Sequence, residues 1–294
     1  MSDFVQQNAS VVKFNTSDAW VILSPIELSI KKKIEALGTP LKDWDINIYR
    51  GILTGYNEAF IISTEKRDEI LANCQTEEER QRTDEIIRPI LRGRDIKKYG
   101  YDWAGLWLIN THNGIKGKLD RIHIEDYPAI KAHLDQYWDK ISIRADKGDT
   151  PYNLRNCAYM DDFLKPKIMY PNMTKFLPFY LDKKTFFQND KSFMITGKNL
   201  SYLSAFLNSS LFKWCYLDNF PELQGGTREL RKIFFDKIPV MQVEKNIEAE
   251  FDILIKEIQE TYSIEKAQII DKKIFELYGL SDEEQNAIGY IEIE

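Results

Sequence analysis

The chain has 294 residues, of which 43% are hydrophobic and 29% charged, as is typical of a globular protein of one large or two ordinary domains. Its apolar runs are far shorter than the roughly 18 residues of a membrane span, and its N-terminus lacks a basic segment followed by a hydrophobic one. We therefore expect a cytoplasmic protein without a membrane partner. Three dispersed cysteines and three histidines argue against a disulfide framework, a structural zinc site or a histidine-based relay.

The first elements have clear boundary signals. Ser24, Pro25 and Glu27 predict the start of a helix with a capping box, and Gly38 with Pro40 predicts its end. Residues 47–62 contain two short β-like runs joined by a turn rich in glycine and asparagine, which predicts a hairpin. A charged helix is expected over Glu77 to Ile87.

Aromatic, β-prone segments dominate the middle of the chain and predict a small, irregular sheet over 103–109, 166–171, 176–181 and 192–196. Asn199 is predicted to cap a helix with a buried stripe from Leu203 to Trp214. Residues 244–278 have the spacing of one long amphipathic helix or of two in tandem, and Ser281 with Glu284 predicts a capping box for a short last helix.

These elements predict an α+β fold, in which a recognition domain with a small irregular sheet and packed helices precedes a C-terminal region of long helices. We divide the chain into a tail or junction at 1–20, a main domain at 21–241 and a helical region at 242–294.

Charge is segregated along the chain. Residues 1–87 hold 10 Lys/Arg and 15 Asp/Glu (−5), residues 88–235 hold 24 and 16 (+8), and residues 242–294 hold 5 and 14 (−9). A basic block mixed with aromatic and amide side chains is typical of a nucleic-acid surface, because cations neutralise phosphates and polar groups read base edges. We expect its cations to gather on one face. The alternative is an unevenly charged but merely solvated surface.

Catalytic motifs are not apparent. The sequence has no phosphate-binding glycine loop, no Gly-x-Ser-x-Gly turn, no Asn/Asp-Pro-Pro-Tyr/Phe segment and no Glu-x-Lys segment of the common metal-dependent nucleases. We therefore assign no catalytic or metal-binding residue to this chain.

Two segments, GILTGYNEAFII at 51–62 and RPILRGRDIKKY at 88–99, resemble signatures of a known family. They are similar to the TaqI-like specificity domain, the target-recognition domain of Type IIG restriction–modification enzymes and adenine-specific DNA methyltransferases. Further similar segments follow in the same order, at 166–170, 203–209, 225–226 with 238–240, and 274–284.

The resemblance implies that this chain recognises double-stranded DNA while a methyltransferase or endonuclease domain or subunit supplies the chemistry. S-adenosylmethionine and Mg²⁺ are then expected only in that parent enzyme, and no cofactor is expected here. The chain is either a fragment of such an enzyme or a free-standing specificity subunit.

Three segments contain the candidate DNA-binding residues. The first concentrates cations around a glycine, the second is a polar turn after a predicted strand, and the third is a glycine loop with an arginine that could pair with guanine. Their members are Arg92, Arg94, Lys97 and Lys98; Asn172, Thr174 and Lys175; and Gln224, Thr227 and Arg228. Packing and ion pairing are the alternative for the arginines, and turn chemistry for the other two segments.

Two other functions stay open at this point. The acidic stretch at 244–278 could dock another subunit, which would make the chain a protein-interaction module without DNA binding. A nuclease with an unfamiliar site is the third possibility.

Overall fold

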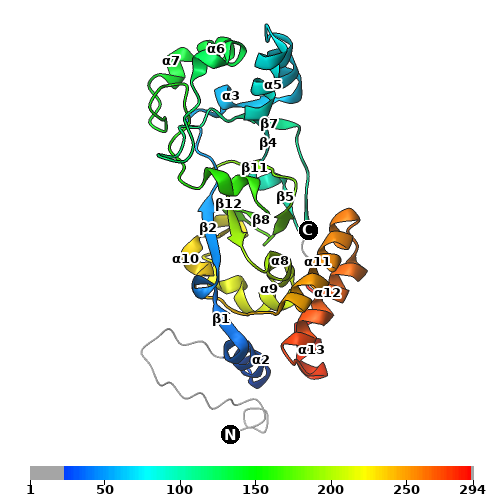
Figure 1. The fold of residues 1–294 in the computed structure, drawn as a ribbon. Coiled ribbons are helices and arrows are strands. Elements are labelled where there is room, and N and C mark those ends of the chain that lie inside the picture. Colours follow the sequence, from blue (N-terminus) through cyan, green and yellow to red (C-terminus); the bar gives the residue numbers. More distant parts are fainter. Residues whose placement is uncertain (1–22, 293–294) are drawn as a thin grey trace, which may run out of the picture.

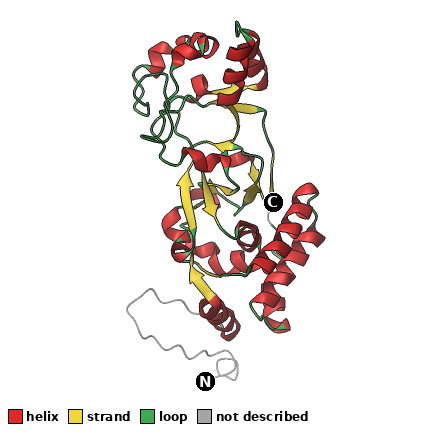
Figure 2. Ribbon diagram, in the orientation of Figure 1, coloured by secondary structure: helices red, strands yellow, loops and turns green. Residues whose placement is uncertain are grey.

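The computed structural model describes residues 23–292, which form an upper and a lower lobe in the view of Figure 1. Helices and short strands are mixed in both lobes (Figure 2), which confirms the predicted α+β class. The tail predicted at 1–20 lies outside the described residues.

A four-stranded antiparallel sheet is the centre of the lower lobe. Its strands, in spatial order, are β10 (Tyr180–Asp182), β8 (Lys167–Pro171), β12 (Ser192–Gly197) and β2 (Ile46–Arg50). Every residue of β8 is buried, because the strand lies between two neighbours and under helices. Three of the segments predicted to form one sheet, 166–171, 176–181 and 192–196, thus contribute strands to it. The fourth, 103–109, contributes the strand Leu106–Ile109 to a different sheet, so the prediction of a single sheet is wrong.

Helix α2 (Pro25–Leu37) begins with the predicted capping box. The Ser24 hydroxyl accepts from the N–H of Glu27, whose carboxylate accepts from the N–H of Ser24. Gly38 follows its last residue and starts β1 (Gly38–Pro40), which pairs with β14 (Pro239–Met241). The two ends of the predicted main domain are therefore joined in one small sheet.

The predicted helix after Asn199 is present but is broken into α8 (Leu200–Asn208) and α9 (Ser210–Tyr216). The break occurs at Ser209, whose extended backbone starts a new helix and whose hydroxyl accepts from the N–H of Phe212. Asn199 occupies the N-cap position of α8, as predicted, but its side chain makes no capping hydrogen bond. Its backbone is left-handed and its amide donates to the Val243 carbonyl instead.

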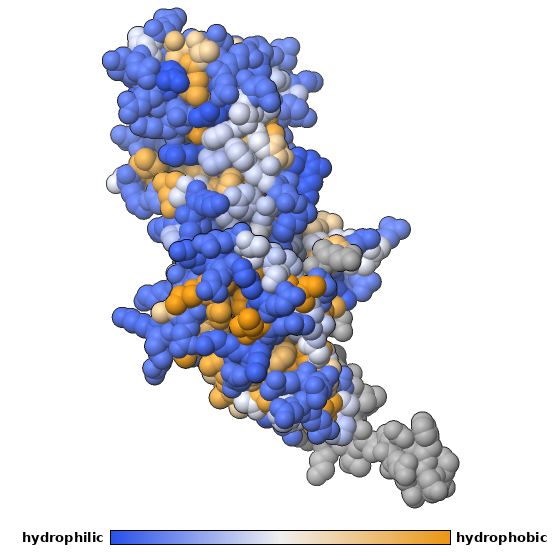
Figure 3. Space-filling model, turned by 90° about the vertical axis from the view of Figure 1, so that its right-hand side faces the viewer, coloured by the Kyte–Doolittle hydropathy of each residue, from blue (hydrophilic) through white to orange (hydrophobic). Residues whose placement is uncertain are grey.

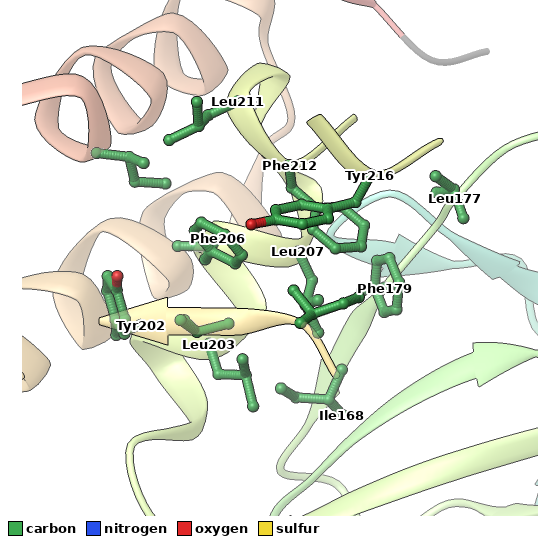
Figure 4. Packing of buried hydrophobic residues seen from close by; sticks show 14 of the residues in the cluster. Ile168, Leu177, Phe179, Tyr202, Leu203, Phe206, Leu207, Leu211, Phe212 and Tyr216 are labelled. Atoms are coloured by element: carbon green, nitrogen blue, oxygen red, sulfur yellow. The ribbon is translucent and has the colours of Figure 1, made fainter. Parts of the chain in front are cut away.

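The C-terminal region forms two tandem helices and a short third one, namely α11 (Lys245–Glu260), α12 (Ile264–Leu277) and α13 (Asp282–Ile288). The capping box of Ser281 and Glu284 is present. Apolar side chains of α11 and α12 pack on α8 and α9 in the core shared with the sheet, part of which Figure 4 shows. Its buried members include Ile168, Phe179, Leu203, Phe206, Phe212, Phe251, Ile255, Ile270 and Ile274.

The upper lobe has its own hydrophobic core and a second four-stranded sheet. The strands are, in spatial order, β11 (Phe187–Gln188), β4 (Ile87–Leu91), β7 (Leu106–Ile109) and β3 (Ile61–Ser63). The surrounding helices are α3 (Asn57–Phe60), α4 (Thr64–Ala72), α5 (Glu77–Ile86), α6 (Pro128–Asp135) and α7 (Trp138–Ile141).

The predicted hairpin at 47–62 is wrong. Its first run is β2, which pairs with β12 in the lower lobe, and its second run is β3, which pairs with β7 in the upper lobe. The residues between them cross from one lobe to the other, and Asn57 begins the short helix α3. Local β-propensity indicated two strands correctly, but their partners lie far away in the sequence.

Smaller elements complete the junction between the lobes. They are β5 (Ile96–Lys97) paired with β6 (Gly100–Tyr101), β9 (Met173–Thr174) paired with β13 (Arg228–Glu229), and helix α10 (Lys232–Phe235). A third cluster of apolar side chains, against which Tyr101 of β6 packs, consists of Leu91, Ile96, Met169, Tyr180 and Phe186. This small core supports the surface on which most candidate residues lie.

Candidate nucleic-acid interface

A groove of about 1040 Å³ lies at the junction of the lobes, lined by residues of β5, β6 and β9, by the end of β8 and by the turn between β11 and β12. Among residues 23–292, its charged lining residues are five cations and one acid, Asp102. Six of the ten candidates line it: Arg92, Arg94, Lys97, Lys98, Asn172 and Thr174. Segments that are far apart in the sequence therefore form one basic surface.

The first segment is shaped by a bond between Arg92 and Asp95. The Asp95 carboxylate is buried and accepts from Nε and Nη2 of Arg92 at 2.9 and 2.7 Å, and from the Arg92 backbone N–H at 2.8 Å. These bonds close the single 3-10 turn Gly93–Asp95. Arg92 thus acts as an internal clamp, which is the alternative that the sequence left open for it.

The neighbouring cations differ in their surroundings. Arg94 is exposed and has no ion-pair partner within the described part of the chain. Lys97 is 52% exposed and lies 3.6 Å from Asp102. Lys98 is partly buried, with its ammonium 5.3 Å from the centre of the Tyr290 ring, and burial lowers its pKa. Arg94 and Lys97 are therefore the cations of this segment that are best placed to meet a phosphate.

The second segment follows β8 along the groove. The backbone of Asn172 is fixed on both sides, because its N–H donates to the Lys191 carbonyl and its own carbonyl accepts from the N–H of Leu230. Thr174 Oγ1 accepts from the N–H of Phe176 at 3.0 Å, as expected for a turn. Lys175 is exposed but does not line the groove.

The third segment adjoins the groove through the ladder between β9 and β13. Arg228 pairs with Thr174 in that ladder, and its Nη1 donates to the Phe220 carbonyl at 2.9 Å while Nη2 lies 3.2 Å from Glu222. Its side chain is largely buried within its own loop. Gln224 and the two glycines after it are exposed, and Thr227 is half-buried.

Gly225 and Gly226 have the conformation that the sequence argument requires. Both have positive φ, +78° and +76°, and a Cβ at either position would meet nothing within 4 Å. Glycine is needed here for the backbone turn, not for space within the chain. The loop is therefore open for close approach by a ligand.

Several lining residues were missed by the sequence argument. The turn between β11 and β12 contributes Asn189 and Lys191, and aromatic side chains come from Tyr101, Phe176 and Tyr262. A polar Asn-Asp-Lys turn between two β-prone runs is visible in the sequence, but only the parallel pairing of β11 with β4 brings it beside Gly93.

The basic block as a whole does not form one face, so that expectation is wrong for part of it. Arg144, Lys167 and Lys213 are buried, and Arg144 donates to backbone carbonyls of the upper lobe. Burial lowers the pKa of Arg144 to about 10. Other cations of the block bind neighbouring carboxylates of the upper lobe, such as Arg121 with Asp149.

The main apolar face of the acidic stretch at 244–278 packs within the chain, because Phe251, Ile255 and Ile270 are buried against α8 and α9. Its outer surface keeps exposed Ile253 and Ile269. On the side that bears α11 to α13, hydrophobic residues gather in the lower lobe, whereas the upper lobe is mostly hydrophilic (Figure 3).

Between residues 23 and 292 no group of three or more His, Cys, Asp or Glu side chains is arranged to hold a metal ion. No helix in this range has the length and apolar character that crossing a membrane requires.

Comparison with known proteins finds similarity to proteins of restriction–modification systems. The model of the TaqI-like C-terminal specificity domain matches residues 88–240. The Type II methyltransferase M.PaeR7I of Pseudomonas aeruginosa is 22% identical over 280 residues, which are 94% of this chain and 45% of that protein. The chain thus spans less than half of this relative's length.

Two solved structures match this chain, and the first of them shows a similar fold. The Type IIL restriction–modification enzyme MmeI, solved in complex with DNA, matches with a TM-score of 0.57 and 12% identity over 83% of this chain and 34% of its own. The type IIG restriction endonuclease BpuSI matches with a TM-score of 0.49 and 13% identity over 87% of this chain and 34% of its own.

Proposed function

Because the chain belongs to the family of TaqI-like C-terminal specificity domains of restriction–modification enzymes, we propose that it binds duplex DNA sequence-specifically through the groove at the junction of its lobes. The observation that supports this most directly is the convergence of the candidate segments. Residues 92–98 and 172–174 line one groove, and residues 224–228 join it through the ladder between Thr174 and Arg228.

The charges of the groove fit a polyanion. Five cations and one acid of the described part of the chain line it, although the whole chain has a net charge of −6. Binding of this kind is driven by release of counterions from phosphates, so local charge matters more than the total. Arg94 and Lys97 are proposed to bind phosphates and to fix the register of the domain on DNA.

Base reading is assigned to the polar side chains around the glycine loop. Gln224, Thr227 and Arg228, together with Asn172 and Thr174, carry the donors and acceptors that base edges pair with. Each good bidentate contact contributes about 1–3 kcal/mol of discrimination, so several must act together. Lys98, Lys175 and Arg92 stay in the proposed set, with Arg92 acting mainly through the turn that it closes.

The chemistry is proposed to lie in a separate methyltransferase or endonuclease domain or subunit. The curated relative is a methyltransferase of which this chain covers 45%. We expect S-adenosylmethionine and Mg²⁺ to be needed by that other part, and we expect the assembled enzyme to act on DNA in the cytoplasm.

Selection from a duplex library with a randomised segment tests sequence-specific binding directly. The chain is incubated with the pool, bound duplexes are recovered and amplified, and the recovered sequences are compared over successive rounds. A common motif that is lost when Gln224, Thr227 and Arg228 are replaced by alanine together supports the proposal. Binding without enrichment of any motif contradicts sequence reading, and no recovery above a control protein contradicts DNA binding.

A further inference from the structure

The turn between β11 and β12, residues 189–191, touches both of the groove-lining loops that the sequence identified. The Lys191 carbonyl accepts from the N–H of Asn172, which begins the second segment. The same carbonyl lies so close to Gly93 that a Cβ on that glycine would be 2.7 Å away. This turn is therefore packed between the Arg92–Asp95 turn and the end of β8.

The conformation of the turn is fixed by its own hydrogen bonds. The Asn189 Oδ1 accepts from the N–H of Lys191 at 3.3 Å, and the Asn189 carbonyl accepts from the N–H and the hydroxyl of Ser192 at 3.1 and 2.9 Å. Arg50 holds the next residue, since its Nε donates to the Asp190 carbonyl at 3.0 Å and its Nη2 lies 3.3 Å from Asp190 Oδ2. These bonds hold every residue of the turn in the structure without a ligand.

The side chain that this turn presents is a lysine in the groove. Lys191 lines the groove, is 72% exposed and lies 3.4 Å from the Asp190 carboxylate. An exposed ion pair of this kind contributes little to stability. The Lys191 ammonium can therefore leave Asp190 and bind a DNA phosphate with little loss of free energy, while the backbone of the turn keeps its position.

We infer that Lys191 is a further DNA-phosphate contact, carried by a pre-formed turn that sets the spacing between the first and second groove segments. This inference rests on the proposed function and adds a residue that the sequence argument missed. It assigns Lys191 to positioning and affinity, and base reading remains with the other segments.

The chain offers a matched control at the opposite end of the same strand. Lys198 follows β12 as Lys191 precedes it, is 78% exposed and lies 2.7 Å from Asp45. Lys198 does not line the groove. Replacing either lysine by alanine removes one exposed, ion-paired cation and leaves the net charge of the variants equal.

The test is fluorescence anisotropy of a labelled random-sequence duplex with the full chain and its Lys191→Ala, Lys191→Arg and Lys198→Ala variants, between about 0.05 and 0.2 M salt. One lost phosphate contact reduces the slope of log K against log salt by about 0.9. If the unchanged chain and Lys191→Ala have equal affinity for DNA at 1 M salt, the affinity of Lys191→Ala at about 0.1 M salt is then roughly eightfold lower than that of the unchanged chain. We expect Lys191→Arg and Lys198→Ala to keep the slope of the unchanged chain.

The possible outcomes distinguish a failure of the Lys191 assignment from a failure of the proposed DNA binding. If the unchanged chain binds DNA and Lys191→Ala has the slope and affinity of Lys198→Ala, the assignment of Lys191 is wrong while the proposed function stands. If Lys191→Arg behaves like Lys191→Ala, the charge of the side chain is not what matters and the inference also fails. If the unchanged chain does not bind, both fail. Thermal unfolding midpoints of the variants show whether each is folded.

Discussion

Thr174 and Arg228 are direct partners in the short antiparallel ladder of β9 and β13. Each comes from a segment that the sequence argument assigned to DNA contact independently, one after a buried strand and the other beside two glycines. The ladder joins the glycine loop to the wall of the basic groove.

Replacement of Arg228 is expected to affect stability as well as DNA reading. The guanidinium donates to the Phe220 carbonyl and lies 3.2 Å from Glu222 within its own loop. Hydrogen bonds with a charged partner contribute about 1.5–3 kcal/mol each. We expect Arg228→Ala to lower the free energy of unfolding by about that amount and to weaken binding to the selected site more than to random DNA.

Urea unfolding and anisotropy on both duplexes separate these effects. Gln224→Ala is the control, because its side chain is exposed and its loss should leave the free energy of unfolding nearly unchanged. An Arg228→Ala variant that is equally weak on both duplexes would remove this arginine from base reading.

Gly93 is expected to tolerate no side chain. A Cβ there would lie 2.7 Å from the Lys191 carbonyl and 3.3 Å from Pro171 Cβ, so one of the two turns has to move. Overpacking of this kind costs about 1–3 kcal/mol. We expect Gly93→Ala to lower the unfolding midpoint and to weaken DNA binding, because it separates the first segment from the turn at 189–191.

Gly100 provides the comparison within the same groove. The nearest atom to a Cβ at Gly100 is the Lys98 carbonyl oxygen at 3.9 Å, so Gly100→Ala should be close to neutral in both measurements. Equal effects of the two substitutions would show that the packing of Gly93 on Lys191 is unimportant.

Lys167 and Asp182 form a buried ion pair, and we expect the effects of replacing them on the free energy of unfolding to be strongly coupled. Both side chains are fully buried, Nζ lies 2.6 Å from Oδ2, and Asp182 also accepts from the N–H groups of Lys184 and Phe186. Burial lowers the pKa of Lys167. Removal of one partner from a buried pair costs about 3–5 kcal/mol, because the other charge is left without a counterion.

A double-mutant cycle measures this coupling. We expect Lys167→Met to be destabilising by about that amount, and Lys167→Met combined with Asp182→Asn to recover part of the loss. The second substitution removes the unpaired buried charge, but the amide oxygen can replace only one of the two carboxylate oxygens that accept from Lys184 and Phe186. Urea unfolding gives the four free energies. Additive losses would contradict the coupling.

Glu284 should contribute pH-dependent stability. Burial alone would raise its pKa, but hydrogen bonds from Lys33, from the N–H of Ser281 and from Ser29 outweigh it and lower the pKa of Glu284 to about 2. Because the pKa is lower in the folded chain than the ordinary value of 4.5, this stabilisation is complete above about pH 4.5 and is lost as the pH falls towards 2.

Measuring the free energy of unfolding of the unchanged chain and of Glu284→Gln at several pH values tests whether this stabilisation is lost in acid. The pKa difference corresponds to roughly 3 kcal/mol, so the gap in unfolding free energy should be largest near neutral pH and should shrink in acid. A gap that stays constant from pH 6 to pH 3 would contradict the assignment.

Sequence patterns predicted much of this structure where the determining contacts are local. The capping boxes at Ser24 and Ser281 and the charged helix after Glu77 follow from neighbouring residues, and the helix ends at Ile86, one residue before the predicted end. The pattern at 244–278 indicated helix correctly but left one long helix and two in tandem open, and the structure has two. The hairpin at 47–62 failed because strand pairing is set by tertiary contacts, which took β2 and β3 into different sheets.

The candidate site was likewise predictable only where local sequence determines the structure. Clustered cations and glycines indicated loops that the structure brings together, but whether a cation is available depends on its partners in space. Arg92 binds Asp95, Arg228 binds its own loop, and Lys167 binds Asp182 inside the sheet. Lys191 enters the groove only through the pairing of β11 with β4, which no local spacing indicates. The division of the chain into three regions and the DNA-contact residues remain predictions.

The salt dependence of duplex binding by the full chain tests the central claim most directly. We expect log K to fall steeply with log salt, and Lys97→Ala to weaken binding to selected and random duplexes alike while reducing the slope by about one. Anisotropy titrations across the same salt range give both values. Absence of binding at low salt, or a slope that is near zero and unchanged by Lys97→Ala, would show that this groove is not a DNA-binding surface.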